Sequence, residues 1–232
     1  MPASLDLIIF DCDGVLVDSE VLSGRAVAEA LEAIGHRISP EGVAERFVGM
    51  SNKDMYAALE SERGTALPAN FDAEMNRLAA ALFERELRPI RGLESALTAL
   101  AEPRCVASSS TPVMLARKLA WTGLTPWFGD AVFSTAEVAR GKPAPDIFLH
   151  AAERMGAAPA RALVVEDSPL GIAAAKAAGM TAFGFTGGSH CRAGHGERLV
   201  AAGADLVFAE MTELPRLVAD VVARGISVYP WH

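Results

Sequence analysis

A short apolar run that ends in two carboxylates constrains the fold of this chain more than any other feature. Residues Leu7–Phe10 are all apolar, and such a run predicts a strand that is buried on both faces of a sheet. Asp11 and Asp13 follow it, and Gly14 then allows a tight turn. Open α/β sheets bind ligands at the carboxyl ends of their strands. The two acids therefore stand where such a sheet places its chemistry, and an Asp-rich turn that merely closes a strand is the competing interpretation.

Beyond Gly92 the chain alternates between extended and helical patterns. Short apolar stretches typical of strands are separated by amphipathic stretches typical of helices. The further strands are predicted at residues 104–107, 131–133, 162–165, 181–185 and 205–208. Such alternation builds right-handed βαβ units, and these form a parallel sheet with helices on both faces. We therefore expect an α/β fold with a Rossmann-like, doubly wound parallel sheet.

Residues 19–88 follow a different pattern, because helical periodicity continues there without a strand signal. One apolar face, for example, includes Val27, Ala30 and Leu31, and Gly35 is a typical helix end. The sequence therefore predicts a Rossmann-like core of residues 1–18 and 89–232, with residues 19–88 inserted as an all-helical cap. The two crossings, near residues 16–20 and 87–92, are expected to act as hinges that let the cap close over a site and exclude water.

The charge balance and the cysteines narrow the function classes. The 232 residues carry a net charge of −8, which disfavours a nucleic-acid partner. The cysteines are dispersed and form no C-x-x-C pair, which fits a reducing compartment and disfavours a zinc site. We find no basic-then-apolar signal segment and no apolar run long enough to span a bilayer. We expect a cytoplasmic protein, a monomer or weak homo-oligomer, that binds a small molecule and neither nucleic acid nor membrane.

Polar side chains also follow other predicted strands. Ser108 and Ser109 follow the second strand, Glu166 and Asp167 end a later one, and Lys142 stands in a proline-rich loop. The carboxyl ends of parallel strands meet at one edge of the sheet, so we expect these groups to converge. Each has an ordinary alternative when taken alone: a polar strand end, a solvated surface lysine, or acids at a helix N-terminus. Their joint occurrence favours a shared site.

The stretch Asp11-x-Asp13-Gly14-x-Leu16-x-Asp18-Ser19 resembles the first motif of the haloacid dehalogenase-like hydrolase superfamily. The helical insertion is similar to the subclass of that family whose cap lies between the first and second motifs. The family's four motifs are matched in order by Asp11, Ser108, Lys142 and Asp167. The resemblance implies that Asp11 is a nucleophile that becomes phosphorylated, and that Asp13 acts as a general acid and base.

The resemblance also implies a Mg²⁺ cofactor. Asp11 and Asp167 offer the hard oxygen ligands that Mg²⁺ prefers. In the family the backbone carbonyl of the second acid, here Asp13, is a further ligand. Glu166 is adjacent and is a candidate to act directly or through water.

The catalytic set expected from these motifs is Asp11, Asp13, Ser108 and Lys142. A carboxylate is already deprotonated at neutral pH and can form an aspartyl-phosphate. Ser108 can donate a hydrogen bond to a phosphoryl oxygen, and Lys142 can neutralise both Asp11 and the phosphoryl group that is transferred.

Other functions remain to be weighed against this one. Dehalogenases of the family lack the acid found at Asp13, and phosphonoacetaldehyde hydrolases, which use a cap lysine comparable to Lys53, lack it too. Hexose phosphomutases carry a histidine where Ser23 stands and an arginine where Asn52 stands. Receiver domains combine similar groups in the reverse order and without a cap. A β-phosphoglucomutase-type mutase and, outside the enzymes, a phospho-Asp signalling or binding domain are the alternatives.

The sequence thus predicts a Mg²⁺-dependent phosphomonoesterase that hydrolyses a small sugar or sugar-acid phosphate through an aspartyl-phosphate. The chain most resembles the branch that includes bacterial 6-phosphogluconate phosphatase and β-phosphoglucomutase-like phosphatases. Arg46 and Lys53, around a loop at residues 49–53 that we expect to face Asp11, are candidate contacts to an anionic substrate. Ser109 is a third candidate.

The glycine-rich segment at residues 187–196 contains His190, Cys191 and His195. Their spacing fits no familiar metal motif, so the sequence favours a surface loop. Cys12, between the two acids of the first motif, is expected to be a small core side chain.

Overall fold

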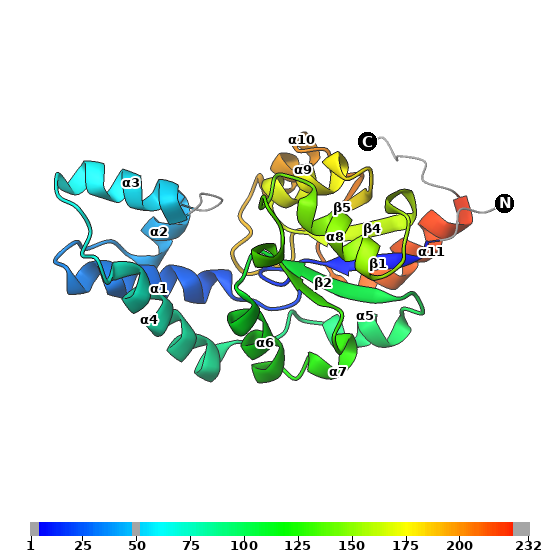
Figure 1. Ribbon diagram of the computed structural model, residues 1–232, viewed down its shortest axis with the longest axis horizontal. Coiled ribbons are helices and arrows are strands. Elements are labelled where there is room, and N and C mark those ends of the chain that lie inside the picture. Colours follow the sequence, from blue (N-terminus) through cyan, green and yellow to red (C-terminus); the bar gives the residue numbers. More distant parts are fainter. Residues whose placement is uncertain (1–4, 48–51, 225–232) are drawn as a thin grey trace. The chain divides into compact units, whose positions relative to one another are not determined.

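The computed structural model describes residues 5–47 and 52–224. The chain divides into two compact units, one made of Met1–Asp18 and Arg88–His232 and the other of Ser19–Leu87. We call these the core unit and the helical unit (Figure 1). None of the helices in the described part of the chain is long and apolar enough to cross a membrane.

The core unit is built on a six-stranded parallel sheet, in the order β3-β2-β1-β4-β5-β6. Its strands are β1 (Leu7–Phe10), β2 (Arg104–Ser108), β3 (Val132–Ser134), β4 (Ala162–Glu166), β5 (Thr181–Phe185) and β6 (Leu206–Phe208). The doubly wound parallel sheet predicted from the sequence is confirmed. The strand order reverses at β1, which pairs with β2 on one side and β4 on the other. This switch point is where open α/β sheets bind their ligands.

Helices cover both faces of this sheet. On one face, Leu7 and Ile9 share a buried cluster with Phe148 of α8 (Asp146–Arg154), Ile172 of α9 (Pro169–Ala177) and Leu199 of α10 (His195–Ala201). On the other face, Phe10 packs edge-on against Phe128 of α7 (Thr125–Phe128), with ring centroids 6.0 Å apart. The sequence did not predict the short helix α7.

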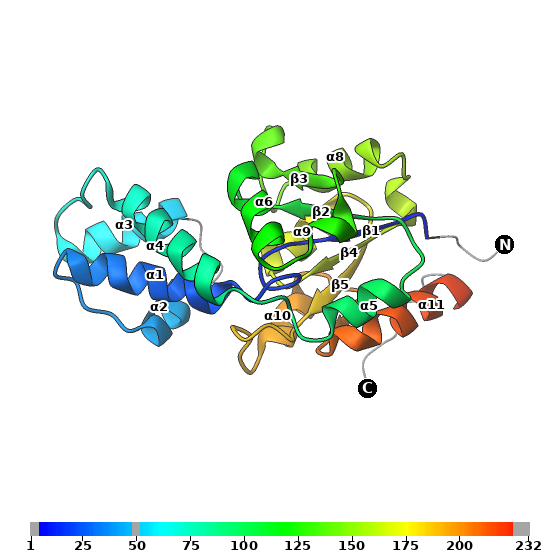
Figure 2. The same cartoon turned by 90° about the horizontal axis from the view of Figure 1, so that it is seen from below.

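The remaining α-helices in the described part of the core unit are α5 (Leu93–Ala99), α6 (Pro112–Trp121) and α11 (Leu214–Arg224), and α5 and α11 lie side by side (Figure 2). All four side chains of β1 are fully buried. Burial of one such side chain contributes about 1.5–3 kcal/mol, so β1 fixes the position of the acids that follow it.

The helical unit consists of α1 (Glu20–Ala33), α2 (Pro40–Phe47), α3 (Asn52–Arg63) and α4 (Phe71–Glu86). Its own core includes Leu31, Phe47, Leu59 and Phe71, all of them buried. An ion pair between Arg25 and Glu86 links α1 to α4 across the surface of the unit. The unit therefore has a hydrophobic core of its own.

Candidate active site

Three carboxylates gather at the carboxyl ends of β1 and β4. Asp11 follows β1, Glu166 ends β4, and Asp167 comes next. One oxygen from each lies within 4.8 Å of the others. The three residues are only 6%, 1% and 6% exposed, respectively. The adjacent pairing of β1 and β4 thus brings together acids that lie far apart in sequence.

Lys142 places its ammonium group between two of these carboxylates. Its Nζ lies 2.6 Å from Asp11 Oδ1 and 2.6 Å from Glu166 Oε1. It also donates to the carbonyl oxygen of Ala107 at 3.3 Å and lies 5.0 Å from the ring centroid of Phe148. The structure therefore brings the loop lysine into the acidic cluster.

Both carboxylate oxygens of Glu166 accept hydrogen bonds. Oε1 accepts from Lys142, and Oε2 accepts from the amides of Asp167 and Ser168 and from the Ser168 hydroxyl, at 2.9–3.1 Å. A Cβ on Gly171, in the first turn of α9, would lie 1.9 Å from this carboxylate. Glu166 thus holds Lys142 and the start of α9 together, and the geometry favours Asp11 and Asp167 as the carboxylates that face a cation.

The cluster carries excess negative charge, because three carboxylates face one ammonium. Burial raises the pKa of Asp11 well above its usual value; Lys142 opposes this rise, and Glu166, Asp167 and Asp13 add to it. Burial lowers the pKa of Lys142, but its pairs with Asp11 and Glu166 outweigh this and raise it. A hard divalent cation would offset the remaining charge, and carboxylate oxygens are the ligands that Mg²⁺ prefers. The donor set therefore fits the predicted Mg²⁺.

Asp13 belongs to a second group beside the first. Its carboxylate pairs with Lys118 of α6, accepts from Ser110 Oγ at 2.8 Å, and Lys118 donates in turn to Ser110 Oγ at 2.9 Å. Lys118 is only 4% exposed. The sequence interpretation missed this lysine, although its place on the apolar face of α6, beside Leu115 and Leu119, was a signal.

The two serines predicted at the end of β2 differ in environment. Ser108 is the last residue of β2 and is buried, and its Oγ accepts from the Ser110 amide at 3.1 Å. Because β2 pairs with β1, Ser108 lies at the sheet edge that carries Asp11. Ser109 is exposed, and its carbonyl accepts from Thr135 Oγ1 at 3.5 Å.

The segment at residues 187–196 is more than the surface loop that its composition indicated. His190 and His195 are buried, and both contact Asp167. His190 Nε2 lies 2.9 Å from Asp167 Oδ2, and His195 Nε2 lies 2.6 Å from the Asp167 carbonyl oxygen. Since Arg198 donates to His195 Nδ1, the proton of His195 resides on Nε2. Burial lowers the pKa of His195, so the ring is neutral near pH 7.

The remaining predictions of the sequence concern Cys12 and the residues of the helical unit. Cys12 is fully buried, and burial raises the pKa of its thiol well above the usual value, as for a core side chain. Arg46 pairs with Glu62 within the helical unit and lies over the Phe47 ring at 4.9 Å. Residues 49–51 of the predicted substrate loop, and the Lys53 side chain, lie outside the described part of the structure.

Comparisons with known proteins agree on one family. A sequence model described as haloacid dehalogenase-like hydrolase matches residues 5–179. The chain is 30% identical to 6-phosphogluconate phosphatase of Escherichia coli over 214 residues, which cover 92% of this chain and 94% of that protein. A conserved haloacid dehalogenase-like protein of unknown function from Agrobacterium tumefaciens superposes with a TM-score of 0.86 at 42% identity, with 94% of this chain and 99% of that one covered.

Another crystal structure, of a HAD family hydrolase from Deinococcus radiodurans with bound phosphate and sodium, superposes with a TM-score of 0.79 at 30% identity. The match covers 99% of this chain and 100% of that one.

The close approach of Gly14 to Asp167 yields a first prediction. Gly14 has φ +77°, and a Cβ there would lie 2.0 Å from Asp167 Oδ2. Gly123 has φ +71° and open space around its Cβ position, so Gly123→Ala is a matched control for the backbone strain of about 1–2 kcal/mol. We expect Gly14→Ala to lower the Tm more than Gly123→Ala does. Gly14→Ala should also abolish most of the hydrolase activity of the protein, whereas Gly123→Ala should retain it. Equal effects of the two variants on turnover would refute a specific need for this contact.

A second prediction follows from the excess negative charge. The folded-state pKa of Asp11 is raised, so the protonated carboxyl group favours the folded state. This contribution to stability is fully present below the unfolded pKa of about 4 and is lost as the pH rises through the folded pKa. In a chelating buffer, Asp11→Asn should therefore have a higher Tm than the wild type, and the gap should widen from pH 5 to pH 8. Mg²⁺ should raise the Tm of the wild type more than that of the variant.

The control for this thermal denaturation series is Asp146→Asn, since Arg140 lowers the pKa of Asp146. This variant should show no gain in Tm. A lower Tm for Asp11→Asn than for the wild type at pH 8 would contradict the charge argument.

Proposed function

The chain belongs to the haloacid dehalogenase-like hydrolases, and we propose that it is a Mg²⁺-dependent phosphatase that hydrolyses sugar or sugar-acid phosphates through an aspartyl-phosphate. The observation that carries this proposal is the buried cluster of Asp11, Lys142, Glu166 and Asp167 at the switch point of the sheet, with Asp13 two residues beyond Asp11. The name of the 6-phosphogluconate phosphatase relative, which aligns over nearly the whole chain, supports the substrate class.

Asp11 is the nucleophile in this proposal. Lys142 binds its Oδ1, and attack proceeds from Oδ2 on the phosphorus of the substrate. An Oδ2–P bond forms while the bond from phosphorus to the substrate oxygen breaks. Lys142 offsets negative charge on the nucleophile and on the phosphoryl group, and Ser108, at the adjacent strand end, is proposed to donate a hydrogen bond to a phosphoryl oxygen.

Asp13 moves the proton in both steps. Its carboxyl group gives a proton to the leaving alkoxide; its carboxylate then takes a proton from the water that attacks phosphorus, which releases phosphate and regenerates Asp11. Lys118 and Ser110 hold this carboxyl group in place. The two carboxylates therefore have separate partners, one lysine each, and separate roles.

Mg²⁺ would be held by the carboxylates of Asp11 and Asp167 and by the backbone carbonyl of Asp13, and when bound it supplies positive charge that lets a phosphate dianion approach the acids. Glu166 serves this site indirectly, because its oxygens already bind Lys142 and the start of α9.

The substrate contacts proposed for Arg46, Lys53 and Ser109 stay predictions. Arg46 would have to exchange Glu62 for a substrate anion. We further propose that the enzyme works in the cytoplasm on a small-molecule substrate, in keeping with its dispersed cysteines and acidic charge.

A phosphatase screen of the purified protein tests the proposed function. Phosphate release should be fastest from sugar and sugar-acid phosphates and slower from nucleotides; it should vanish in chelator and return with Mg²⁺. Asp11→Asn should lower kcat by at least about 10⁴-fold, which is the scale of losing a catalytic nucleophile. The control variant Asp146→Asn should retain the wild-type kcat. Activity of Asp11→Asn within about a hundredfold of the wild type would exclude the nucleophile assignment. Isomerisation of a hexose phosphate without phosphate release would instead identify a mutase.

The role of Asp13 predicts a dependence on the leaving group. An alkoxide needs a proton as it leaves, whereas a nitrophenolate is already a stable anion. Asp13→Asn should therefore lower kcat/KM about 10²–10⁴-fold for a sugar phosphate and much less for an aryl phosphate. Paired steady-state kinetics on the two substrates measure this. Equal losses on both would rule out proton transfer by Asp13.

A further inference from the structure

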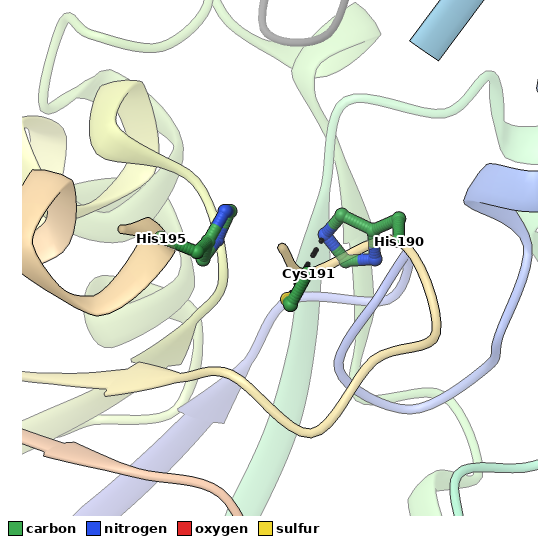
Figure 3. A group of neighbouring side chains, drawn as sticks. All are labelled: His190, Cys191 and His195. Atoms are coloured by element: carbon green, nitrogen blue, oxygen red, sulfur yellow. Dashed lines mark hydrogen bonds between the residues drawn. The ribbon is translucent and has the colours of Figure 1, made fainter. Parts of the chain in front are cut away.

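His190, Cys191 and His195 form a cluster that the proposed reaction does not use. His190 and Cys191 lie on the segment between β5 and α10, and His195 is the first residue of α10. One potential ligand atom from each lies within 4.8 Å of the others (Figure 3). Imidazole and thiolate are the ligands that zinc and similar transition metals prefer, whereas Mg²⁺ prefers oxygen. The cluster therefore differs in chemistry from the acidic site.

We propose that His190, Cys191 and His195 bind a transition-metal ion of the Zn²⁺ class, at a site distinct from the Mg²⁺ site and adjacent to it. Atoms and charges balance simply: the Cys191 thiol loses its proton to solvent and the metal takes the thiolate and two imidazole nitrogens, with water in the fourth position. The proposal does not depend on phosphatase activity.

The distance within the adjacent pair supports a metal ligand set. Cys191 Sγ and His190 Nε2 are 3.5 Å apart. Zinc holds sulfur at about 2.3 Å and nitrogen at about 2.0–2.1 Å, so two such ligands at a tetrahedral angle stand about 3.5 Å apart. The pair is thus already at the spacing that a bound zinc ion requires.

The surroundings hold the cluster in place before a metal arrives. Asp18 Oδ1 accepts from both the amide and the hydroxyl of Ser189, at 3.1 and 2.8 Å, which anchors the segment to the chain after β1. Gly188 has no Cβ, and a Cβ there would lie 2.8 Å from the His190 ring. Preorganisation of this kind lowers the cost of assembling a metal site.

His195 has a polar partner on each ring nitrogen, Arg198 on Nδ1 and the Asp167 carbonyl on Nε2. Metal binding needs one of these bonds to give way. Arg198 is exposed, so its guanidinium can turn toward solvent. The bond that remains, from imidazole N–H to a backbone carbonyl, is the kind that orients metal-bound histidines. His190 Nε2 lies 2.9 Å from Asp167 Oδ2, so this contact also has to open, and the ring proton has to reside on Nδ1, before Nε2 can bind the metal. The Asp167 carboxylate then supplies negative charge near the cation.

Titration of tag-free protein with Co²⁺ tests the proposal, because thiolate ligation gives an absorption band that oxygen ligands do not. The experiment is run in excess Mg²⁺, which occupies the acidic cluster. We expect one equivalent of Co²⁺ with the thiolate band, displaced by Zn²⁺. Cys191→Ser should lose the band, and His195→Ala should weaken binding by about 10–100-fold or more, at least the effect of losing a supporting contact.

Matched controls separate this site from the rest of the chain. Cys105→Ala removes a thiol in β2, and His36→Gln removes a histidine of the helical unit; both should bind Co²⁺ as the wild type does. Circular dichroism checks that each variant is folded. The absence of the band in the wild type, or its persistence in a folded Cys191→Ser variant, would overturn the proposal.

Discussion

The buried ammonium of Lys142 is the group on which the rest of the site depends. It lies 2.6 Å from Asp11, which directly follows β1, and 2.6 Å from Glu166, which ends the neighbouring strand β4. Removal of Lys142 would leave buried carboxylates without their positive charge, and such a loss costs about 3–5 kcal/mol. Lys142 therefore lets the sheet edge carry several acids, and it ties the loop that precedes α8 to β1 and β4.

The single positive charge of Lys142 is nevertheless not enough to balance the three carboxylates of the cluster. Glu166 is satisfied by Lys142 and by the amides at the start of α9, so the deficit falls on Asp11 and Asp167. On the proposal that Asp11 is the nucleophile, the site disfavours the ionised form of Asp11 and so lowers the stability of the metal-free fold. In exchange it would bind a cation and then a phosphate, which is the usual relation between stability and activity at functional sites.

The sequence predicted those parts of the structure that local patterns determine. The buried strand before Asp11, the alternation beyond Gly92 and the polar strand ends fix a parallel sheet, and such a sheet brings Asp11 and Glu166 together. Lys118 could have been found from its place on the apolar face of α6, whereas the burial of His190 results from long-range packing, which periodicity does not encode. For Glu166 the alternative interpretation, an acid at a helix N-terminus, describes its bonds to the Asp167 and Ser168 amides as well as the proposed site does.

Asp167 connects the two clusters of the core unit. Its carboxylate belongs to the acidic group and also lies 2.9 Å from His190, while its carbonyl accepts from His195. A cation in the His–Cys cluster would draw His190 toward itself and weaken its hold on that carboxylate. A cation in the acidic cluster would draw Asp167 the other way. Because both proposed ions would act on the same carboxylate, binding at one site would alter the affinity of the other, and by thermodynamic linkage the effect would be equal in both directions.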